Sequence, residues 1–166
     1  MPSLSDRLAL PLLDPGQAQK EVFHNDALMM IDLLLQGAVV DSAVDDPPLS
    51  PLAGQCWIVG ASPSGAWTAK MAAIAGWTVA GWRFIEPRSG MTLWSIAQGF
   101  WVHYDGTDWI EGVLPVASIA INGLQIIGPQ AAAIADPSGG AVIDAQARAT
   151  IAQLLSALRV HGLIAT

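Results

Sequence analysis

Residues 76–109 read GWTVAGWRFIEPRSGMTLWSIAQGFWVHYDGTDW. This stretch carries five of the seven tryptophans of the chain, and Trp57 and Trp67 precede it. Most of the tryptophans follow a glycine by one or two residues. Tryptophan fits a pleated, half-buried surface, and glycine permits the positive φ of tight turns. We therefore predict a small Trp-rich antiparallel β meander over residues 55–112.

Seven strands are expected in this meander. They are Cys56–Val59, Met71–Ile74, Thr78–Ala80, Arg83–Glu86, Met91–Ser95, Phe100–Tyr104 and Asp108–Ile110. The apolar segment that follows is predicted to form a further hairpin, because Asn122-Gly123 is a dipeptide favoured in type I′ turns. This segment is too apolar for a solvated linker, so we expect it to pair with the sheet or to lie between subunits.

Helices are expected on both sides of the meander. Asn25 is suited to cap a helix over residues 26–39. Asp144 is suited to cap a second helix over residues 145–160, which Gly162 would end in the left-handed conformation. The predicted fold class is α+β, with an N-terminal arm and helix, the Trp-rich meander, and a C-terminal helix in an oligomeric bundle. Two domains are expected, residues 1–112 and residues 113–166, the second with the apolar β segment and the oligomerisation helix.

The composition limits the classes of partner. The 166 residues carry a net charge of −7 and have a pI of about 4.5, so there is no basic surface for nucleic acid or an anionic membrane. Only 13% of the residues are charged, against about 25% in typical domains, and the mean hydropathy is +0.45. This composition favours a surface that is partly buried against other subunits.

Targeting and redox signals point to assembly in a bacterial cytoplasm. The apolar runs are shorter than the ~18 residues that a membrane span needs, so membrane insertion is not expected. The basic n-region of a secretory signal is not evident in the first 20 residues. Cys56 is the single cysteine of the chain, which excludes an internal disulfide and a cysteine-cluster metal site.

The C-terminal helix is predicted to be the oligomerisation element. Its apolar residues follow the spacing of a short coiled-coil seam, and one further leucine widens it. These residues are Ala147, Ile151, Leu154, Leu155 and Leu158. About two heptads are not stable alone in water, so the seam must pack on its own domain or on copies of the chain.

Catalytic, cofactor and metal sites are not predicted. The three histidines lie on different elements, far from metal-ligand spacing. Residues 105–108 read Asp-Gly-Thr-Asp, for which a hairpin turn is favoured over a calcium loop because the further acidic ligands are missing. Asp108 and Glu111 are considered as a glycosidase pair, but nothing in the sequence places them across a cleft.

The aromatic residues are the candidate contacts for a sugar, since aromatic faces stack on sugar rings. Side chains beside glycine turns are the ones expected to reach the surface, with two carboxylates near enough to accept from sugar hydroxyls. These candidate glycan contacts are Trp82, Trp101, Tyr104, Asp105 and Asp108. The alternative is that most of the tryptophans build the core of a small sheet.

The proline-bearing arm that precedes Asn25 is predicted to attach the chain to a larger particle. Gln17, Gln19 and Lys20 offer hydrogen bonds to the backbone of a neighbouring protein. The alternative is that this arm packs on its own domain.

Three parts of the sequence together resemble a known family. They are 8–11 with 17–22 and 24–28, 54–60 with 65–67, and 128–130 with 133–137 and 161–165. These stretches resemble a domain family of unannotated function from alphaproteobacterial prophages and gene transfer agents, in which such proteins resemble head-spike or tail-fibre components. Some of those proteins are linked to binding the capsular polysaccharide of the recipient cell.

The resemblance implies a structural protein of a phage-like particle, released with that particle, and it supplies no catalytic residues. The expected partners are copies of the chain in a threefold or fivefold assembly and other particle proteins, such as a capsid vertex or a docked fibre. Host capsular polysaccharide is a further candidate partner. The alternatives that stay open are a stand-alone carbohydrate-binding module and a cell-wall hydrolase.

Overall fold

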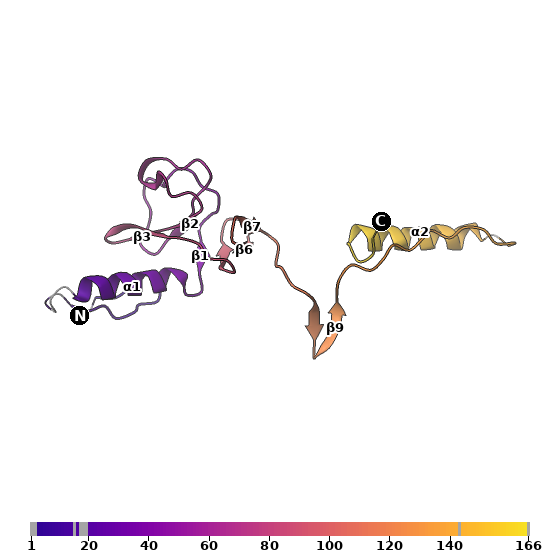
Figure 1. Cartoon of the computed structure of the whole chain (residues 1–166), viewed down its shortest axis with the longest axis horizontal. Coiled ribbons are helices and arrows are strands. Elements are labelled where there is room, and N and C mark those ends of the chain that lie inside the picture. The colour runs from indigo at the N-terminus through magenta and orange to yellow at the C-terminus, as the bar shows by residue number, and fades with distance from the viewer. Residues whose placement is uncertain (1–2, 15, 17–19, 143, 166) are drawn as a thin grey trace. The chain divides into compact units, whose positions relative to one another are not determined.

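The structure, a computed structural model, describes residues 3–14, 16, 20–142 and 144–165. The chain divides into two compact units, Met1–Leu114 and Pro115–Thr166. The described residues form helices and several small sheets, which confirms the predicted α+β class (Figure 1).

The first unit contains two sheets and a helix. A four-stranded sheet has the order β1-β5-β6-β7, and a three-stranded sheet has the order β2-β3-β4. The strands are β1 Ala38–Val39, β2 Cys56–Ile58, β3 Ile74–Thr78, β4 Gly81–Ile85, β5 Thr92–Ser95, β6 Phe100–Tyr104 and β7 Trp109–Glu111. β1 runs parallel to β5, and the other neighbours are antiparallel.

The strand predictions succeed best where a turn residue marks the boundary. β6 has the predicted bounds, but the strand predicted at 78–80 is wrong, because Thr78 ends β3 and residues 79–80 form the turn to β4. Thr78 Oγ1 donates to Gly81 O at 2.9 Å and accepts from Ala80 N at 3.2 Å. The strand predicted at 71–74 is likewise displaced, since β3 begins at Ile74.

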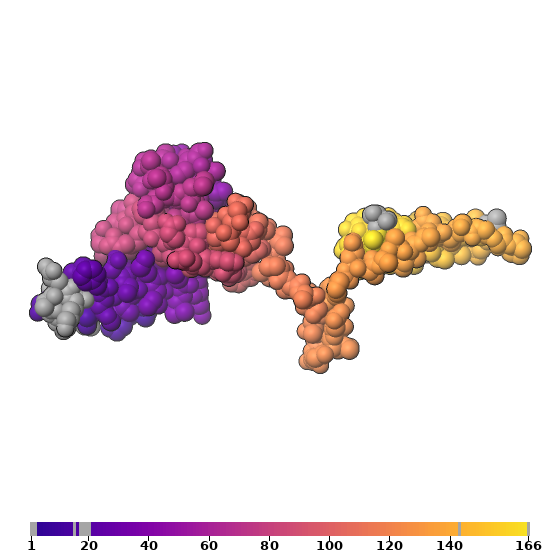
Figure 2. Space-filling view, viewed as in Figure 1, coloured from indigo at the N-terminus to yellow at the C-terminus, as the bar shows by residue number. Residues whose placement is uncertain are grey.

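α1 spans Lys20–Leu34 and packs against the rest of the first unit (Figure 2). Leu33 makes this contact with the sheets and is 1% exposed. A Cβ at Gly76 of β3 would overlap the Leu33 side chain, so glycine permits this close approach. The predicted bounds of this helix are wrong at both ends. α1 begins before Asn25, and Val39 belongs to β1, where it pairs with Ser95.

Asn25 has a different role from the predicted helix cap. Its side-chain amide donates to Leu13 O and accepts from Leu13 N, both at 2.9 Å. The polar side chain thus holds the preceding arm against α1, a tertiary contact that competes with local capping.

Four of the seven tryptophans form one cluster in the first unit. Trp57 and Trp67 are buried, and Trp77 and Trp82 pack beside them half-buried. The ring centroids of Trp67 and Trp82 lie 5.1 Å apart at 81°, an edge-to-face arrangement. Trp67 is 0% exposed, and its Nε1 has no hydrogen-bond partner among the described residues.

Removing the Trp67 ring should therefore destabilise the first unit strongly. We expect Trp67→Ala to lower the free energy of unfolding by about 3–5 kcal/mol, because the substitution leaves a cavity among packed aromatic rings. Guanidinium unfolding followed by circular dichroism measures this loss. Trp101→Ala is the control, since Trp101 is 43% exposed, and an equal loss in both variants would contradict the expectation.

The second unit contains a hairpin and a helix. The hairpin consists of β8 Ile119–Ile121 and β9 Leu124–Ile127. Asn122 and Gly123 form its turn with φ of 51° and 77°, as the sequence predicts for a type I′ turn.

α2 spans Ala145–Val160, in agreement with the prediction. Asp144 Oδ1 accepts from Ala147 N at 2.9 Å, which makes Asp144 the N-cap. At the other end Gly162 has a φ of +69°, and Leu163 N donates to Leu158 O at 2.9 Å. These are the features of a Schellman motif.

The segment 131–139 runs beside α2. Ala131 forms a β-bridge with Ile164. Arg159 donates to Asp136 Oδ1 at 3.1 Å and to Ile134 O at 2.5 Å, and Arg148 donates to Gly139 O. This segment therefore covers one face of the helix.

Candidate functional site

The outer face of the four-stranded sheet carries an exposed aromatic pair. Trp94 of β5 and Trp101 of β6 are cross-strand partners, with ring centroids 5.2 Å apart at 77°. They are 37% and 43% exposed. Because side chains alternate along a strand, Leu93 and Val102 point to the opposite face, where they join the core.

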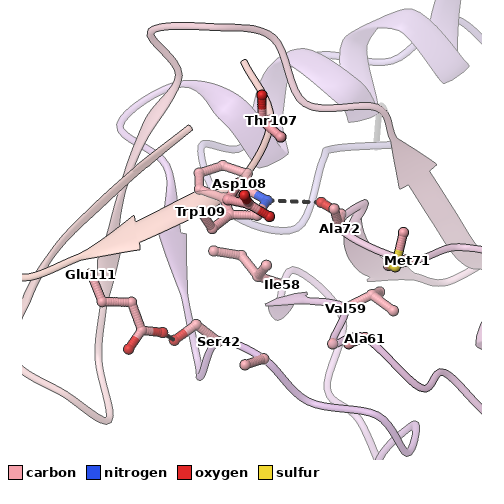
Figure 3. Close-up of a pocket in the computed structure, with 12 residues that line it drawn as sticks. Ser42, Ile58, Val59, Ala61, Met71, Ala72, Thr107, Asp108, Trp109 and Glu111 are labelled. Carbon is pink, nitrogen blue, oxygen red and sulfur yellow. Dashed lines mark hydrogen bonds between the residues drawn. The ribbon is translucent and has the colours of Figure 1, made fainter. Parts of the chain in front are cut away.

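A pocket with a volume of about 200 Å³ lies beside β7 (Figure 3). Its polar groups include the carboxylates of Asp108 and Glu111, and Ser42 Oγ donates to the Glu111 carboxylate. Met71 and Trp109 contribute apolar lining. Trp109 Nε1 donates to a backbone carbonyl of the pocket wall, Ala72 O, at 2.8 Å, which fixes the indole ring.

Asp105 organises the turn between β6 and β7. Its Oδ1 accepts from Thr107 N at 2.7 Å and from Asp108 N at 2.9 Å. These hydrogen bonds, first the one from Asp108 and then the one from Thr107, lower the pKa of the Asp105 carboxyl. The carboxylate therefore builds the turn, as the sequence favours, and sets the position of Asp108.

The structure does not bring the five candidate glycan contacts into a single pocket. Trp101 is exposed on β6, and Asp108 lines the pocket beside β7. Tyr104 is half-buried, with its ring centroid 5.3 Å from that of Trp109. Trp94 and Glu111 complete these two surfaces. Trp94 was not predicted as a contact, and Glu111 was considered only as the partner of Asp108 in a glycosidase pair. The alternation of apolar and polar residues around Trp94 was the signal that could have predicted an outward-facing side chain there.

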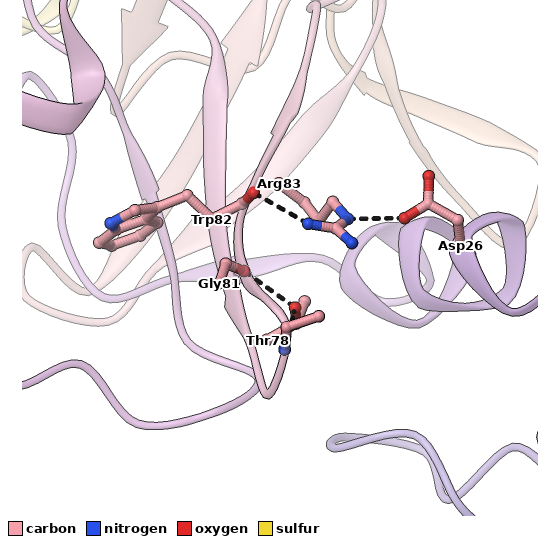
Figure 4. Close-up of polar contacts among 6 residues, drawn as sticks. Asp26, Thr78, Gly81, Trp82 and Arg83 are labelled. Carbon is pink, nitrogen blue, oxygen red and sulfur yellow. Dashed lines mark hydrogen bonds and ion pairs between the residues drawn. The ribbon is translucent and has the colours of Figure 1, made fainter. Parts of the chain in front are cut away.

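Trp82 lies in the other sheet, with its ring in the tryptophan cluster. The ring centroid is 4.9 Å from that of Trp77. Arg83, the next residue of β4, donates through Nε to Asp26 Oδ1 of α1 at 2.6 Å (Figure 4). Both partners are partly exposed, so this ion pair contributes about 0–1 kcal/mol. Trp82 thus belongs to the packing between β4 and its neighbours.

The described residues 3–14 of the N-terminal arm pack on their own unit. Asp32 is 0% exposed and accepts from Arg7 N at 2.9 Å and Leu8 N at 2.7 Å. The Arg7 guanidinium donates to Leu33 O at 2.6 Å, at the end of α1. Of the candidate attachment residues, Gln17 and Gln19 lie outside the described residues, and Lys20 is the first residue of α1.

Cys56 is buried beneath the arm at 1% exposure. Burial raises the pKa of its thiol to about 11, while Arg7 lowers it and Asp32 raises it to smaller extents. The thiol is therefore protonated at neutral pH and shielded from reagents.

We expect the Cys56 thiol of the native protein to be unreactive toward a thiol reagent at about pH 8. After unfolding in guanidinium, one thiol per chain should react, because the sequence contains one cysteine. Absorbance of the released chromophore measures both values. Rapid labelling of the native chain would contradict the burial of Cys56.

α2 has two faces with different environments. Successive residues of a helix are rotated by about 100°, so Leu155 shares a face with Arg148 and Arg159. This face is covered by the segment 131–139, and Leu155 is 7% exposed.

The seam face lies roughly a quarter turn away and is uncovered. Ile151 is 43% exposed, Leu154 60% and Leu158 36%, and Ala147 is also exposed. The structure thus leaves four of the five predicted oligomerisation residues on one exposed apolar face, and it buries Leu155 in the chain itself.

The described residues contain no group of three or more His, Cys, Asp or Glu side chains that could hold a metal ion. In the same part of the chain, neither the length nor the apolar character of any helix suffices to cross a bilayer.

A family model described as "Protein of unknown function (DUF2793)" matches residues 24–110. The match covers more than half of the chain, and the chain belongs to this family. The matched residues lie in the first unit, with the tryptophan cluster and the Trp94–Trp101 pair. A search of curated proteins found no match.

Proposed function

We propose that this family member is a structural component of a phage-like particle, either a head spike or a tail-fibre protein or its base. In this proposal the protein self-assembles, attaches to the particle and supports adhesion to the host cell. It is assembled in the bacterial cytoplasm and leaves the cell as part of the released particle. The proposed role is not enzymatic and takes no cofactor.

The exposed seam of α2 is the observation that carries this proposal. Ile151, Leu154 and Leu158 are between 36% and 60% exposed on one helical face. Complete burial of such a side chain stabilises by roughly 1.5–3 kcal/mol. Cyclic packing of several copies would bury the seam on every chain, because the seams of all copies would face the common axis.

The residues on either side of the seam also favour association between copies of α2. In coiled-coil terms the positions on its open side are Thr150 and Ala157, which are small and uncharged. The other side carries Arg148 and Leu155. The chain itself covers Leu155 and binds the Arg148 guanidinium through Gly139 O. On the open side, neighbouring copies would therefore meet without like-charge repulsion. The assembly would be threefold for a fibre or fivefold for a capsid vertex.

We expect Leu154→Asp to dissociate the oligomer, because assembly would bury a charge without a partner, at a cost of several kcal/mol. Size-exclusion chromatography with light scattering measures the mass. Ser156→Asp is the matched control, since Ser156 is exposed and lies on the side of α2 opposite to the seam. The control should keep the mass of the parent.

Two outcomes would contradict the proposal. The first is a parent protein with the mass of a single chain, 17.3 kDa. The second is an unchanged oligomer mass in Leu154→Asp. Circular dichroism of each variant separates dissociation from unfolding of the first unit.

A second candidate function is direct binding of host capsular polysaccharide. The observation that favours it is the exposed Trp94–Trp101 pair, which offers aromatic surface for stacking. The pocket beside β7 offers the Asp108 and Glu111 carboxylates as acceptors for sugar hydroxyls. The other three candidate residues would act indirectly. Trp82 and Tyr104 would contribute through packing against other aromatic rings, and Asp105 through the turn that positions Asp108.

We expect the host's capsular glycan to change the tryptophan fluorescence if this second function holds. Trp101→Ala should abolish the change, and Asp108→Ala tests whether the pocket contributes. Val79→Ala is the control, because Val79 lies on the β3–β4 turn of the other sheet and is 85% exposed. Unchanged fluorescence of the parent protein at millimolar sugar would contradict direct binding. The protein would then be a scaffold that positions another sugar-binding protein.

A further inference from the structure

The hairpin β8–β9 has one apolar face and one small or polar face. Ile121 pairs with Leu124, and Ile119 pairs with Ile127, so these four side chains lie on one side. Ala120 pairs with Gln125 on the other side, and Ile126 is the extra residue at the register shift. The hairpin is therefore amphipathic, although it contains no charged residue.

The apolar face is exposed to solvent. The exposed fractions are 46% for Ile119, 59% for Ile121, 68% for Leu124 and 45% for Ile127. A two-stranded hairpin is only marginally stable in water, so this face needs a cover in the functional protein.

The distribution of charge along the chain favours a second copy of the chain as the partner that buries this apolar face. Each copy carries a net charge of −7, but between Gly112 and Ile143 the sequence contains only one charged residue, Asp136. Copies of an acidic chain repel one another over most of their surface and meet without repulsion at a neutral segment. An oppositely charged partner has no group to pair with on this hairpin.

Continuity with the α2 seam also favours a second copy. The hairpin and α2 belong to the same unit, and residues 128–144 connect them. Once the seams of two chains associate, their hairpins are held at an effective concentration in the millimolar range. Weak apolar packing between hairpins is then sufficient for association.

We infer that β8–β9 is a second assembly element, in which hairpins of neighbouring copies pack through the face of Ile119, Ile121, Leu124 and Ile127. This inference rests on the proposed self-assembly and adds a specific contact to it. The opposite face, with Ala120 and Gln125, remains at the surface of the assembly.

Single introduced cysteines test this contact in the full chain. Cys56 is buried, so it does not compete in the native protein. Ile121→Cys places a thiol on the apolar face, and Gln125→Cys places one on the opposite face of the same hairpin. Leu124→Cys is a second variant on the apolar face.

We expect mild oxidation to give a covalent dimer as the main product of Ile121→Cys and Leu124→Cys on a non-reducing gel. Gln125→Cys at the same concentration should stay monomeric on that gel. Adding Leu154→Asp to Ile121→Cys should abolish the dimer, because the hairpins are then no longer held together.

The outcomes separate this inference from the proposed function. An oligomer of normal mass whose Ile121→Cys and Leu124→Cys variants do not crosslink overturns the hairpin contact and leaves self-assembly intact. Equal crosslinking of Gln125→Cys overturns the assignment of the apolar face. A monomeric parent protein overturns both.

Discussion

The first unit depends on one core that joins both of its sheets to α1. Leu33 lies among Val39, Cys56, Ile58, Ile74, Ile85, Leu93 and Val102, which come from β1 to β6. The approach of the helix is set by Gly76, where any side chain would meet Leu33. The N-terminal arm is held at the same part of α1. The buried carboxylate of Asp32, next to Leu33, accepts hydrogen bonds from the backbone N–H groups of Arg7 and Leu8. Loss of this contact would therefore loosen helix, arm and sheets together.

The two units satisfy their apolar groups in different ways. The first buries its apolar side chains in the core around Leu33 and in the tryptophan cluster. Among the described residues of the second unit, the buried hydrophobic side chains are Leu155 and Ile164. If copies associate through the seam and the hairpin, the stability of the second unit depends on protein concentration, whereas that of the first unit does not.

The sequence predicts best those features whose signals act over a few residues. Asp144, Gly162 and Asn122-Gly123 set their cap and turn through local backbone bonds, and all three are confirmed. Asn25 has the same capping chemistry, but its amide binds Leu13, twelve residues away, and α1 continues through it. The pocket beside β7 could not be predicted because it also depends on contacts between distant residues. Ser42 and Glu111, for example, meet only in the folded unit. Alternation alone cannot tell that Trp82 packs in a cluster while Trp101 faces outward.

The covered face of α2 has a consequence for assembly. Arg148 and Arg159 bind the backbone of the segment 131–139, so the helix and this segment form one packed element within each chain. A helix of about two heptads would otherwise lose much conformational entropy on association. The cap, the Schellman turn and the two arginines already fix the helix in the single chain. In the proposed assembly the seam would therefore be formed before copies meet, which would lower the entropic cost of association. The segment also keeps Leu155 from joining the seam, which limits the apolar face to a narrow line. In the proposed assembly, such a narrow, preorganised face would select partner helices in one register and disfavour unspecific aggregation through α2.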